Sequence, residues 1–413
     1  MSTGEVTEAA PGDGAADGPG GHLVAPSRAG RLSGVDATRG LALFGMMAVH
    51  VLPLRDWDGT ASAAGLIASG RSAATFAVLA GVGLALSTGG TRPLGDRSWV
   101  ERAAAITVRA AAIGFVGLLL GYGDSRVAVI LPYYALLFLF ALPLLPLGPR
   151  PLAALGVGIA VLVPVVSFPA RADIETRVFE NPTFETVFEE PRDLLVTLLL
   201  TGYYPVLAWT TYICAGLAIG RLPLRSVRTA AGLLAGGSAL ALGASGLSAL
   251  LLGPLGGLAR LAASDSPRGD VAQLEAALDF DMNGNVPTDT WWWLVVDSPH
   301  SNTPLNLLGS VGVAAALLGA LLLVSRTRPG SWLVVPLAAA GSMTLSLYSA
   351  HVLLLSSDLL PDDDLTSYGY QVFLALVFAV GWRAWVGRGP LEALIAMLAD
   401  RAGRAAARAG RAA

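Results

Sequence analysis

Two polar side chains in the apolar stretch DATRGLALFGMMAVHVLPL, residues 36–54, are the first candidates for chemistry. On an α-helix the step from Arg39 to His50 is about 20° more than three full turns and roughly 16 Å along the axis, so both share one face. Arginine binds phosphates through its planar guanidinium, and imidazole acts as a nucleophile or general base near neutral pH. This pattern is typical of transfer between a donor on one side of a membrane and an acceptor on the other. The alternative is that Arg39 marks the cytoplasmic end, paired with Asp36, and that His50 is interfacial.

Two further candidates lie in other apolar segments. His351, in LYSAHVLLL, is predicted at a depth similar to that of His50. It is expected to line the same cavity, oriented by a hydrogen bond with Tyr348, or else only to stabilise the bundle through an interhelical hydrogen bond. Arg71 is predicted to position an anionic part of a substrate, unless it pairs with the acidic residues of the adjacent loop, RDWDG.

The composition is that of a membrane protein. Hydrophobic residues make up 54% and charged residues 14% of the 413 residues, and the mean hydropathy is +0.61, which excludes an ordinary soluble protein. The single cysteine, Cys214, excludes an internal disulfide and a cysteine-based metal cluster. The histidines are too scattered to predict a metal site, and no nucleic-acid partner is expected.

Apolar segments long enough to cross a hydrocarbon core of about 30 Å occur in about ten places. We therefore predict an all-α, polytopic membrane protein, a bundle of about ten transmembrane helices. Arginines concentrate in alternate connections and acidic residues in the others, which places both termini in the cytoplasm. The predicted spans lie near residues 36–54, 66–88, 101–121, 126–147, 151–168, 193–219, 228–252, 304–324, 332–355 and 368–387.

The two ends of the chain differ from this apolar middle. Residues 1–30, rich in Gly, Ala, Pro and acids and without an apolar signal region, are predicted to be a disordered cytoplasmic tail. Residues 31–398 form the predicted transmembrane domain, and residues 399–413 an arginine-rich cytoplasmic tail. Its arginines recur on one stripe of a helix, which would lie on anionic headgroups or in solvent: Arg401, Arg404, Arg408 and Arg411.

Several segments, in order and over most of the chain, resemble one family. They resemble bacterial membrane proteins related to the catalytic domain of heparan-alpha-glucosaminide N-acetyltransferase. The spacing of Arg39 and His50 also resembles the first-helix signature of the wider membrane acyltransferase superfamily that modifies surface glycans. The segments are RLSGVDATRGLALFGMMAVHVLP at 31–53, GRSAATFAVLAGVGLAL at 70–86, TGYYPVLAWTTYICAGLAIGR at 201–221, MTLSLYSAHVLLL at 343–355 and GRGPLEALI at 387–395.

The resemblance implies a multi-pass acyltransferase of the bacterial cytoplasmic membrane. It would move an acyl group, commonly acetyl, from cytoplasmic acetyl-CoA to an extracytoplasmic glycan or lipid-linked sugar. His50 and His351 are then the catalytic candidates. Arg39, Arg102 and Arg109 are the candidates for binding CoA, although the last two also fit ordinary topology determinants.

The loop after the first segment departs from the family. In the human-type enzyme the active histidine lies in this loop, whereas RDWDGTASAAG contains no histidine. Two routes therefore stay open: a covalent acyl-histidine intermediate, or direct transfer from the thioester with His50 as general base.

The long connection at about 253–303 supplies the remaining substrate-binding candidates, together with Arg71. Trp292, in the triplet WWW, is expected either to stack on a sugar or to dip into the membrane interface. His300, three residues after Asp297, is predicted at the outer mouth, where the two would form an acid/base pair.

Two other classes of function stay open. The motif RDWDG is also typical of the acidic, cation-binding loop of lipid-linked-sugar glycosyltransferases. A transporter or flippase without chemistry would equally retain charged side chains inside the membrane.

Overall fold

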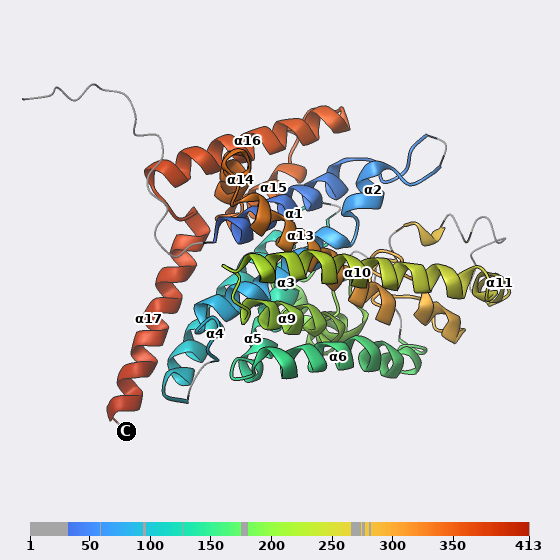
Figure 1. The fold of residues 1–413 in the computed structure, drawn as a ribbon, viewed down its shortest axis with the longest axis horizontal. Coiled ribbons are helices and arrows are strands. Elements are labelled where there is room, and N and C mark those ends of the chain that lie inside the picture. The colour runs from blue at the N-terminus through green and yellow to red at the C-terminus, as the bar shows by residue number, and fades with distance from the viewer. Residues whose placement is uncertain are drawn as a thin grey trace, which may run out of the picture. The chain divides into compact units, whose positions relative to one another are not determined.

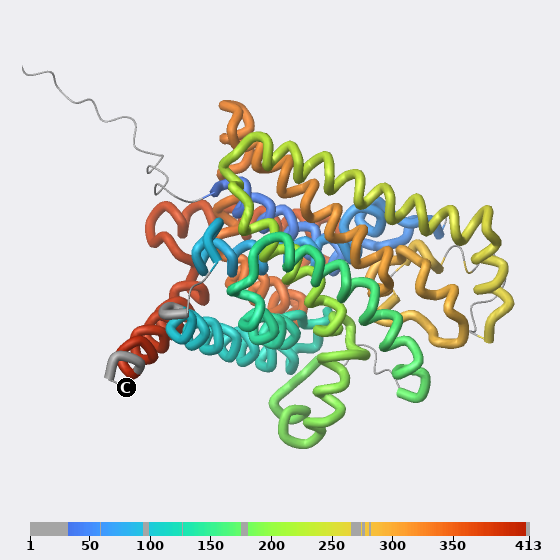
Figure 2. Tube along the Cα trace, turned by 60° about the horizontal axis from the view of Figure 1, so that its bottom comes forward, coloured from blue at the N-terminus to red at the C-terminus, as the bar shows by residue number. Residues whose placement is uncertain are grey.

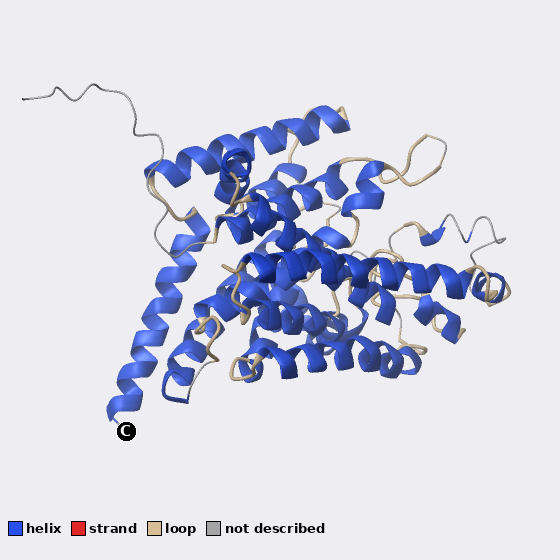
Figure 3. Ribbon diagram, in the orientation of Figure 1, coloured by secondary structure: helices blue, strands red, loops and turns tan. Residues whose placement is uncertain are grey.

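In the computed structural model, the described residues are 32–57, 59–93, 96–125, 127–174, 181–265, 274, 277–280 and 282–412. They form helices joined by loops, and these residues contain no strand beyond an isolated bridge between Arg55 and Ala61 (Figure 3). The predicted all-α class is therefore confirmed. The predicted N-terminal tail, residues 1–30, lies outside the described residues, as does Asp58 of the first loop.

The helices follow one another along the whole described chain (Figure 1). In the first half they are α1 (Ser33–Val51), α2 (Ala63–Ala68), α3 (Arg71–Ser87), α4 (Asp96–Leu120), α5 (Leu131–Ala141), the 3-10 helix η1 (Leu142–Leu144), α6 (Pro149–Ala170), α7 (Phe184–Glu189), α8 (Pro191–Val196), the π-helix η2 (Thr197–Thr201) and α9 (Val206–Gly220). In the second half they are α10 (Val227–Leu252), α11 (Gly257–Ala262), the 3-10 helix η3 (Trp291–Val295), α13 (Pro304–Val324), α14 (Arg328–Ala340), α15 (Thr344–Leu355), α16 (Asp364–Trp385) and α17 (Pro390–Ala412).

The protein is a multi-pass membrane protein. Six of its described helical stretches are long and apolar enough to cross a membrane, and the number rises to eight if each of two bent pairs counts as one span. One bent pair joins α8 and η2 to α9 at 51°, and the other joins α14 to α15 at 65°. Each of the ten predicted segments overlaps a helix, but α1 is not among the stretches that qualify, and α5 with η1 is shorter than a full span.

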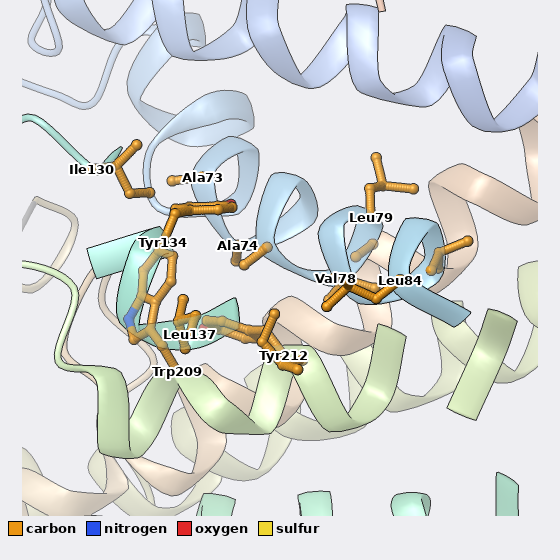
Figure 4. Packing of buried hydrophobic residues seen from close by; sticks show 14 of the residues in the cluster. Ala73, Ala74, Val78, Leu79, Leu84, Ile130, Tyr134, Leu137, Trp209 and Tyr212 are labelled. Carbon is orange, nitrogen blue, oxygen red and sulfur yellow. The ribbon is translucent and has the colours of Figure 1, made fainter. Parts of the chain in front are cut away.

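The centre of the bundle is an apolar core built around α3. This helix packs against α1, α9 and α13. Val78 and Tyr212 are buried between α3 and α9, and Leu79 is buried on the side of α3 that is turned away from α9 (Figure 4). The helices α10 and α13 lie side by side (Figure 2). The helix α17 runs at a steep angle to α6 and α10 (Figure 1) and packs against α4.

A close crossing of α1 with α14 fixes the helix that carries Arg39 and His50. A Cβ atom on Gly40 would overlap the carbonyl oxygen of Leu337, and one on Gly341 would overlap that of Asp36. Small residues of this kind let two membrane helices approach backbone to backbone. The crossing lies beside the bend between α14 and α15, so the start of α15 is placed next to α1.

Candidate active site

The candidate site lies along α1. This helix runs without a break from Ser33 to Val51, so Arg39 and His50 keep the spacing of roughly 16 Å expected from the sequence. Each of the two side chains meets other helices at its own end of α1, and the site therefore has two parts, an imidazole pair and an arginine group.

The imidazole pair consists of His50 on α1 and His351 on α15. Nδ1 of His50 lies 3.0 Å from Nε2 of His351, within hydrogen-bond distance. The ring centroids are 5.2 Å apart and the ring planes differ by 13°. The two nitrogens are closer than van der Waals contact and lie between the ring centres, so the rings meet edge to edge. This is the arrangement of an N–H···N hydrogen bond. The two histidines predicted for one cavity are thus brought into direct contact.

Gln371 on α16 orients the buried member of the pair. Its Oε1 lies 2.7 Å from Nδ1 of His351, and its Nε2 donates to the hydroxyl of Ser367 at 3.4 Å. The expected partner Tyr348 does not hold this position, because both ring nitrogens of His351 contact other side chains, those of His50 and Gln371. The hydroxyl of Tyr348 instead accepts a hydrogen bond from the backbone N–H of Ile130. The Tyr348 prediction is therefore wrong, and Gln371 takes its place.

The first turn of α15 is held by Glu392 at the start of α17. One carboxylate oxygen accepts hydrogen bonds from the backbone N–H groups of Leu345 (2.8 Å) and Ser346 (3.2 Å), and the other accepts from the Ser346 hydroxyl (2.6 Å). These N–H groups have no partner within the helix, and a carboxylate there is favoured by the helix dipole. The segments MTLSLYSAHVLLL and GRGPLEALI are thereby joined, and the helix that carries His351 is fixed at its N-terminal end.

At the other end of α1, Arg39 is held between its own helix and α3. Its guanidinium pairs with Asp36 at 3.4 Å and donates to the carbonyl oxygen of Leu79 at 3.1 Å. A Cβ atom at Gly83 would overlap the same guanidinium, so α3 leaves space for it. The side chain keeps 25% of its surface exposed. The guanidinium of Arg39 therefore pairs with Asp36 and still keeps part of its surface accessible.

Arg109 is near enough to interact electrostatically with both Arg39 and Arg388. The charges that act on Arg109 of α4 include those of Arg39 and of Arg388, which lies in the loop before α17, with Asp400 as the nearby negative charge. Arg109 and Arg388 are both exposed. Arg102 is exposed two turns earlier on α4. We call Arg39, Arg109 and Arg388 the arginine group.

The other polar candidates lie near the His50 end. His300 is close enough to interact electrostatically with His50, and it packs against Tyr203 and Tyr204 with a left-handed backbone (φ 49°). Its neighbour Asp297 accepts a hydrogen bond from Ser245 (2.5 Å). Burial raises the pKa of Asp297, while this hydrogen bond and the charge of Arg71 act in the opposite direction.

Arg71 begins α3 instead of lying inside a helix. The predicted segment 66–88 is interrupted at Gly70, whose φ of 67° is a left-handed conformation that favours glycine. The Arg71 side chain donates to the carbonyl oxygen of Leu66. The carboxylate of Asp297 is near enough to interact electrostatically with Arg71.

The tryptophan triplet forms the 3-10 helix η3. Trp293 is fully buried and donates to Asp289 (2.8 Å), and Trp291 stacks on Phe168 with ring centroids 4.5 Å apart. Trp292 is half-buried beneath the guanidinium of Arg260, 4.6 Å from the ring centroid. One face of Trp292 is therefore already covered by a cation–π contact.

The described side chains combine a base with groups that bind anions. An imidazole whose second nitrogen is held by a partner can accept a proton or attack an acyl carbon, and exposed guanidinium groups bind phosphates. Sequence reasoning missed Gln371, Glu392 and Arg388, although Glu392 and Arg388 lie in one of the quoted family segments. Among the described residues, no group of three or more His, Cys, Asp or Glu side chains is placed to hold a metal ion.

Comparison with known proteins gives one result. A family model described as "Heparan-alpha-glucosaminide N-acetyltransferase, catalytic" matches residues 31–248. The matched region begins just before α1 and ends inside α10, so it includes Arg39, His50 and Arg109. No curated protein matches the chain.

Proposed function

Because the chain belongs to the heparan-alpha-glucosaminide N-acetyltransferase catalytic family, we propose that it transfers acetyl from cytoplasmic acetyl-CoA to an extracytoplasmic glycan or lipid-linked sugar. One observation carries the proposal. The helix α1 has an imidazole pair at one end and a group of arginines at the other, roughly 16 Å away.

The arginine group is the proposed site for the phosphates of CoA. Its three guanidinium groups come from α1, α4 and the loop before α17, and only Asp400 offsets them among the charges that act on Arg109. Phosphates are bound by such partly exposed guanidinium groups. Arg102 extends the same basic side of α4 by two turns. The long pantetheine arm of CoA would then carry the thioester along α1 towards His50.

The acceptor would enter at the His50 end. His300, Arg71 and Trp292 are the proposed acceptor-binding residues. The electrostatic contact between His300 and His50 supports this location for His300. A hydroxyl or amine of a sugar is the expected nucleophile. Arg71 would position an anionic substituent of that sugar or of its lipid carrier.

Both chemical routes use the same nitrogen, Nε2 of His50. In direct transfer, Nε2 takes the proton of the acceptor as the acceptor bonds to the acetyl carbon, the C–S bond breaks and the CoA thiolate leaves. In the covalent route, Nε2 first bonds to the acetyl carbon with loss of CoA thiolate, and the acceptor then displaces the imidazole. In either route the acceptor loses one proton and CoA leaves as a thiolate, so the charges balance.

This direction of transfer needs a defined topology. We propose about ten membrane crossings, with α1 and α5 as spans and with both termini in the cytoplasm. The arginine group then faces the cytoplasm and the His50 end faces outward. Residues 1–30 and 399–413 are the proposed cytoplasmic tails, and the bacterial cytoplasmic membrane is the proposed location.

The test is acetyl transfer by purified protein in lipid nanodiscs, given radiolabelled acetyl-CoA and a cell-envelope extract. We expect label to appear on a glycan or a lipid-linked sugar. His50→Ala should remove transfer while the protein still folds, and Arg39→Ala should mainly raise KM for acetyl-CoA. His22→Ala, in the N-terminal segment, is the matched control and should behave as wild type.

Three outcomes would contradict the proposal. Wild-type transfer by His50→Ala would remove the imidazole from the chemistry. Sugar transfer that requires an added divalent cation and ignores acetyl-CoA would identify a glycosyltransferase. Solute uptake by proteoliposomes without any acyl donor would identify a transporter or flippase.

A further inference from the structure

The hydrogen bonds around the imidazole pair form a directional chain. The chain starts on α16 at Ser367, passes through Gln371 to His351 on α15, and ends at His50 on α1. His351 is 1% and Gln371 is 2% exposed, whereas His50 is only half-buried. The buried members therefore act on the one imidazole that is accessible.

The direction of the chain follows from the amide oxygen of Gln371. Because Oε1 is purely an acceptor, the proton of the contact at 2.7 Å belongs to Nδ1 of His351. A neutral imidazole carries one N–H, so Nε2 of His351 is an acceptor. It accepts from Nδ1–H of His50 across 3.0 Å, and this leaves the lone pair of the His50 ring on Nε2.

The amide of Gln371 presents its oxygen to His351 and its nitrogen to its own helix. Its nitrogen donates to the hydroxyl of Ser367, four residues earlier on the same helix. The neighbouring residue, Tyr368, donates its hydroxyl to the carbonyl oxygen of Phe44 at 3.3 Å and so ties α16 to α1. An amide turned the other way would present N–H groups to His351, and the chain would then place the proton on Nε2 of His50.

We propose that Gln371 is a positioning residue that fixes both histidines in the tautomer with Nε2 of His50 unprotonated. For the reaction this inference rests on the proposed function, in which Nε2 takes the acceptor's proton or attacks the thioester. The tautomer itself is a property of the resting protein and does not depend on the substrate. Gln371 touches neither donor nor acceptor in this role.

The test combines a tautomer measurement with kinetics on three variants. Gln371→Met keeps the length of the side chain but has no acceptor of comparable strength, and Gln371→Glu keeps an acceptor that has no N–H. Tyr368→Phe is the matched control, because it removes an α16–α1 hydrogen bond that does not touch a histidine. The nitrogen-15 spectrum of protein labelled on histidine in lipid bilayers reports which nitrogen is protonated, and the chain has only four histidines.

We expect His50 to be protonated on Nδ1 in the wild type, in Gln371→Glu and in Tyr368→Phe. In these two variants kcat should stay within about twofold of the wild-type value, since a loss of general-base catalysis would lower it far more. In Gln371→Met we expect His50 protonated on Nε2 in a large share of molecules and kcat lower by about 100-fold, the lower end of what general-base catalysis contributes. KM for acetyl-CoA should stay unchanged, because the arginine group is at the far end of α1.

Protonation of Nε2 of His50 in the wild type would overturn the inference. An unchanged tautomer and kcat in Gln371→Met would overturn it equally. If the tautomers behave as expected while His50→Ala transfers acetyl at the wild-type rate, the proposed function fails and the assignment of Gln371 as the residue that sets the tautomer stands.

Discussion

Replacing Glu392 with alanine should both destabilise the protein and slow acetyl transfer. The substitution removes the three hydrogen bonds that the carboxylate accepts from Leu345 and Ser346 in the first turn of α15. Two backbone N–H groups then lose their partner inside the protein, and the Ser346 hydroxyl loses its acceptor. His351 lies on the same helix about 7 Å further along, so a shift of this turn reaches the imidazole pair.

The size of the effect follows from what the carboxylate does. Loss of a side chain that satisfies N-terminal N–H groups costs about 0.5–2 kcal/mol, and loss of its charge at the positive end of the helix about 0.3–1 kcal/mol. We therefore expect Glu392→Ala to lower the free energy of unfolding by about 2 kcal/mol. Glu392→Gln keeps an acceptor oxygen and should lose only the charge contribution. A displacement of about 1 Å at His351 is enough to lower kcat by about 100-fold.

The assay is apparent Tm in detergent together with acetyl transfer in nanodiscs. Glu189→Ala is the matched control, because Glu189 is an exposed glutamate at the end of another helix, α7. We expect Tm to fall by a few degrees, about 2–4 °C per kcal/mol, in Glu392→Ala alone, with Glu392→Gln between it and wild type. Equal Tm and equal kcat in Glu392→Ala and Glu189→Ala would refute the reasoning that Glu392 holds the catalytic helix.

Three other perturbations test separate parts of the structure. Arg221 is 3% exposed and donates to backbone carbonyls at the end of α3 and after η1, so Arg221→Ala should cost about 3 kcal/mol or more in the free energy of unfolding, measured by denaturant titration. Gly341→Ala should prevent recovery of folded protein on size-exclusion chromatography because its Cβ would overlap the carbonyl of Asp36, whereas Gly243→Ala, with open space around it, should fold normally. Anionic lipid is expected to raise the Tm of the wild type, and exchange of the exposed arginines of α17 for glutamine should remove this rise. The measurement is Tm in nanodiscs with and without phosphatidylglycerol. An equal rise in Tm for the wild type and the variant would contradict a lipid contact. These arginines are Arg401, Arg404 and Arg408.

Helical periodicity was sufficient to predict the geometry of α1. The polar residues Arg39 and His50 stand out in an apolar segment, and their spacing defines a shared face without any knowledge of other helices. A similar depth placed His351 near His50, and the structure brings the two rings into hydrogen-bond contact. Their roles in chemistry stay predictions.

Periodicity could not identify the partners that orient these side chains. Gln371 on α16 meets His351 on α15 through a side-chain contact, which is a tertiary contact between residues twenty positions apart. The available signal was the amide itself, a polar group in the apolar segment 368–387, since such groups need a partner inside a membrane. Glu392 could have been noticed for the same reason in GRGPLEALI, but its target on α15 has no signature in the sequence.

Hydropathy also could not distinguish a continuous span from a broken one. The predicted segments 193–219 and 332–355 are apolar throughout, yet each contains a bend, at Gly202–Pro205 and at Gly341–Met343. Glycine and proline in TGYYP and AAAGSMT mark these breaks. The described residues therefore give six to eight candidate spans, and the count of about ten stays a prediction.

The enclosure of α1 has a consequence for how the protein is made. Its neighbours are α3, α13, α14, α15 and α16, most of which come from the last third of the chain. The helix α1 is therefore synthesised before most of the helices that enclose it. Asp36 and Arg39, in the first two turns of α1, pair with each other, and Arg39 also donates to the carbonyl oxygen of Leu79 on α3. We expect the candidate catalytic helix to reach its final packing only after α13, α14, α15 and α16 have been made.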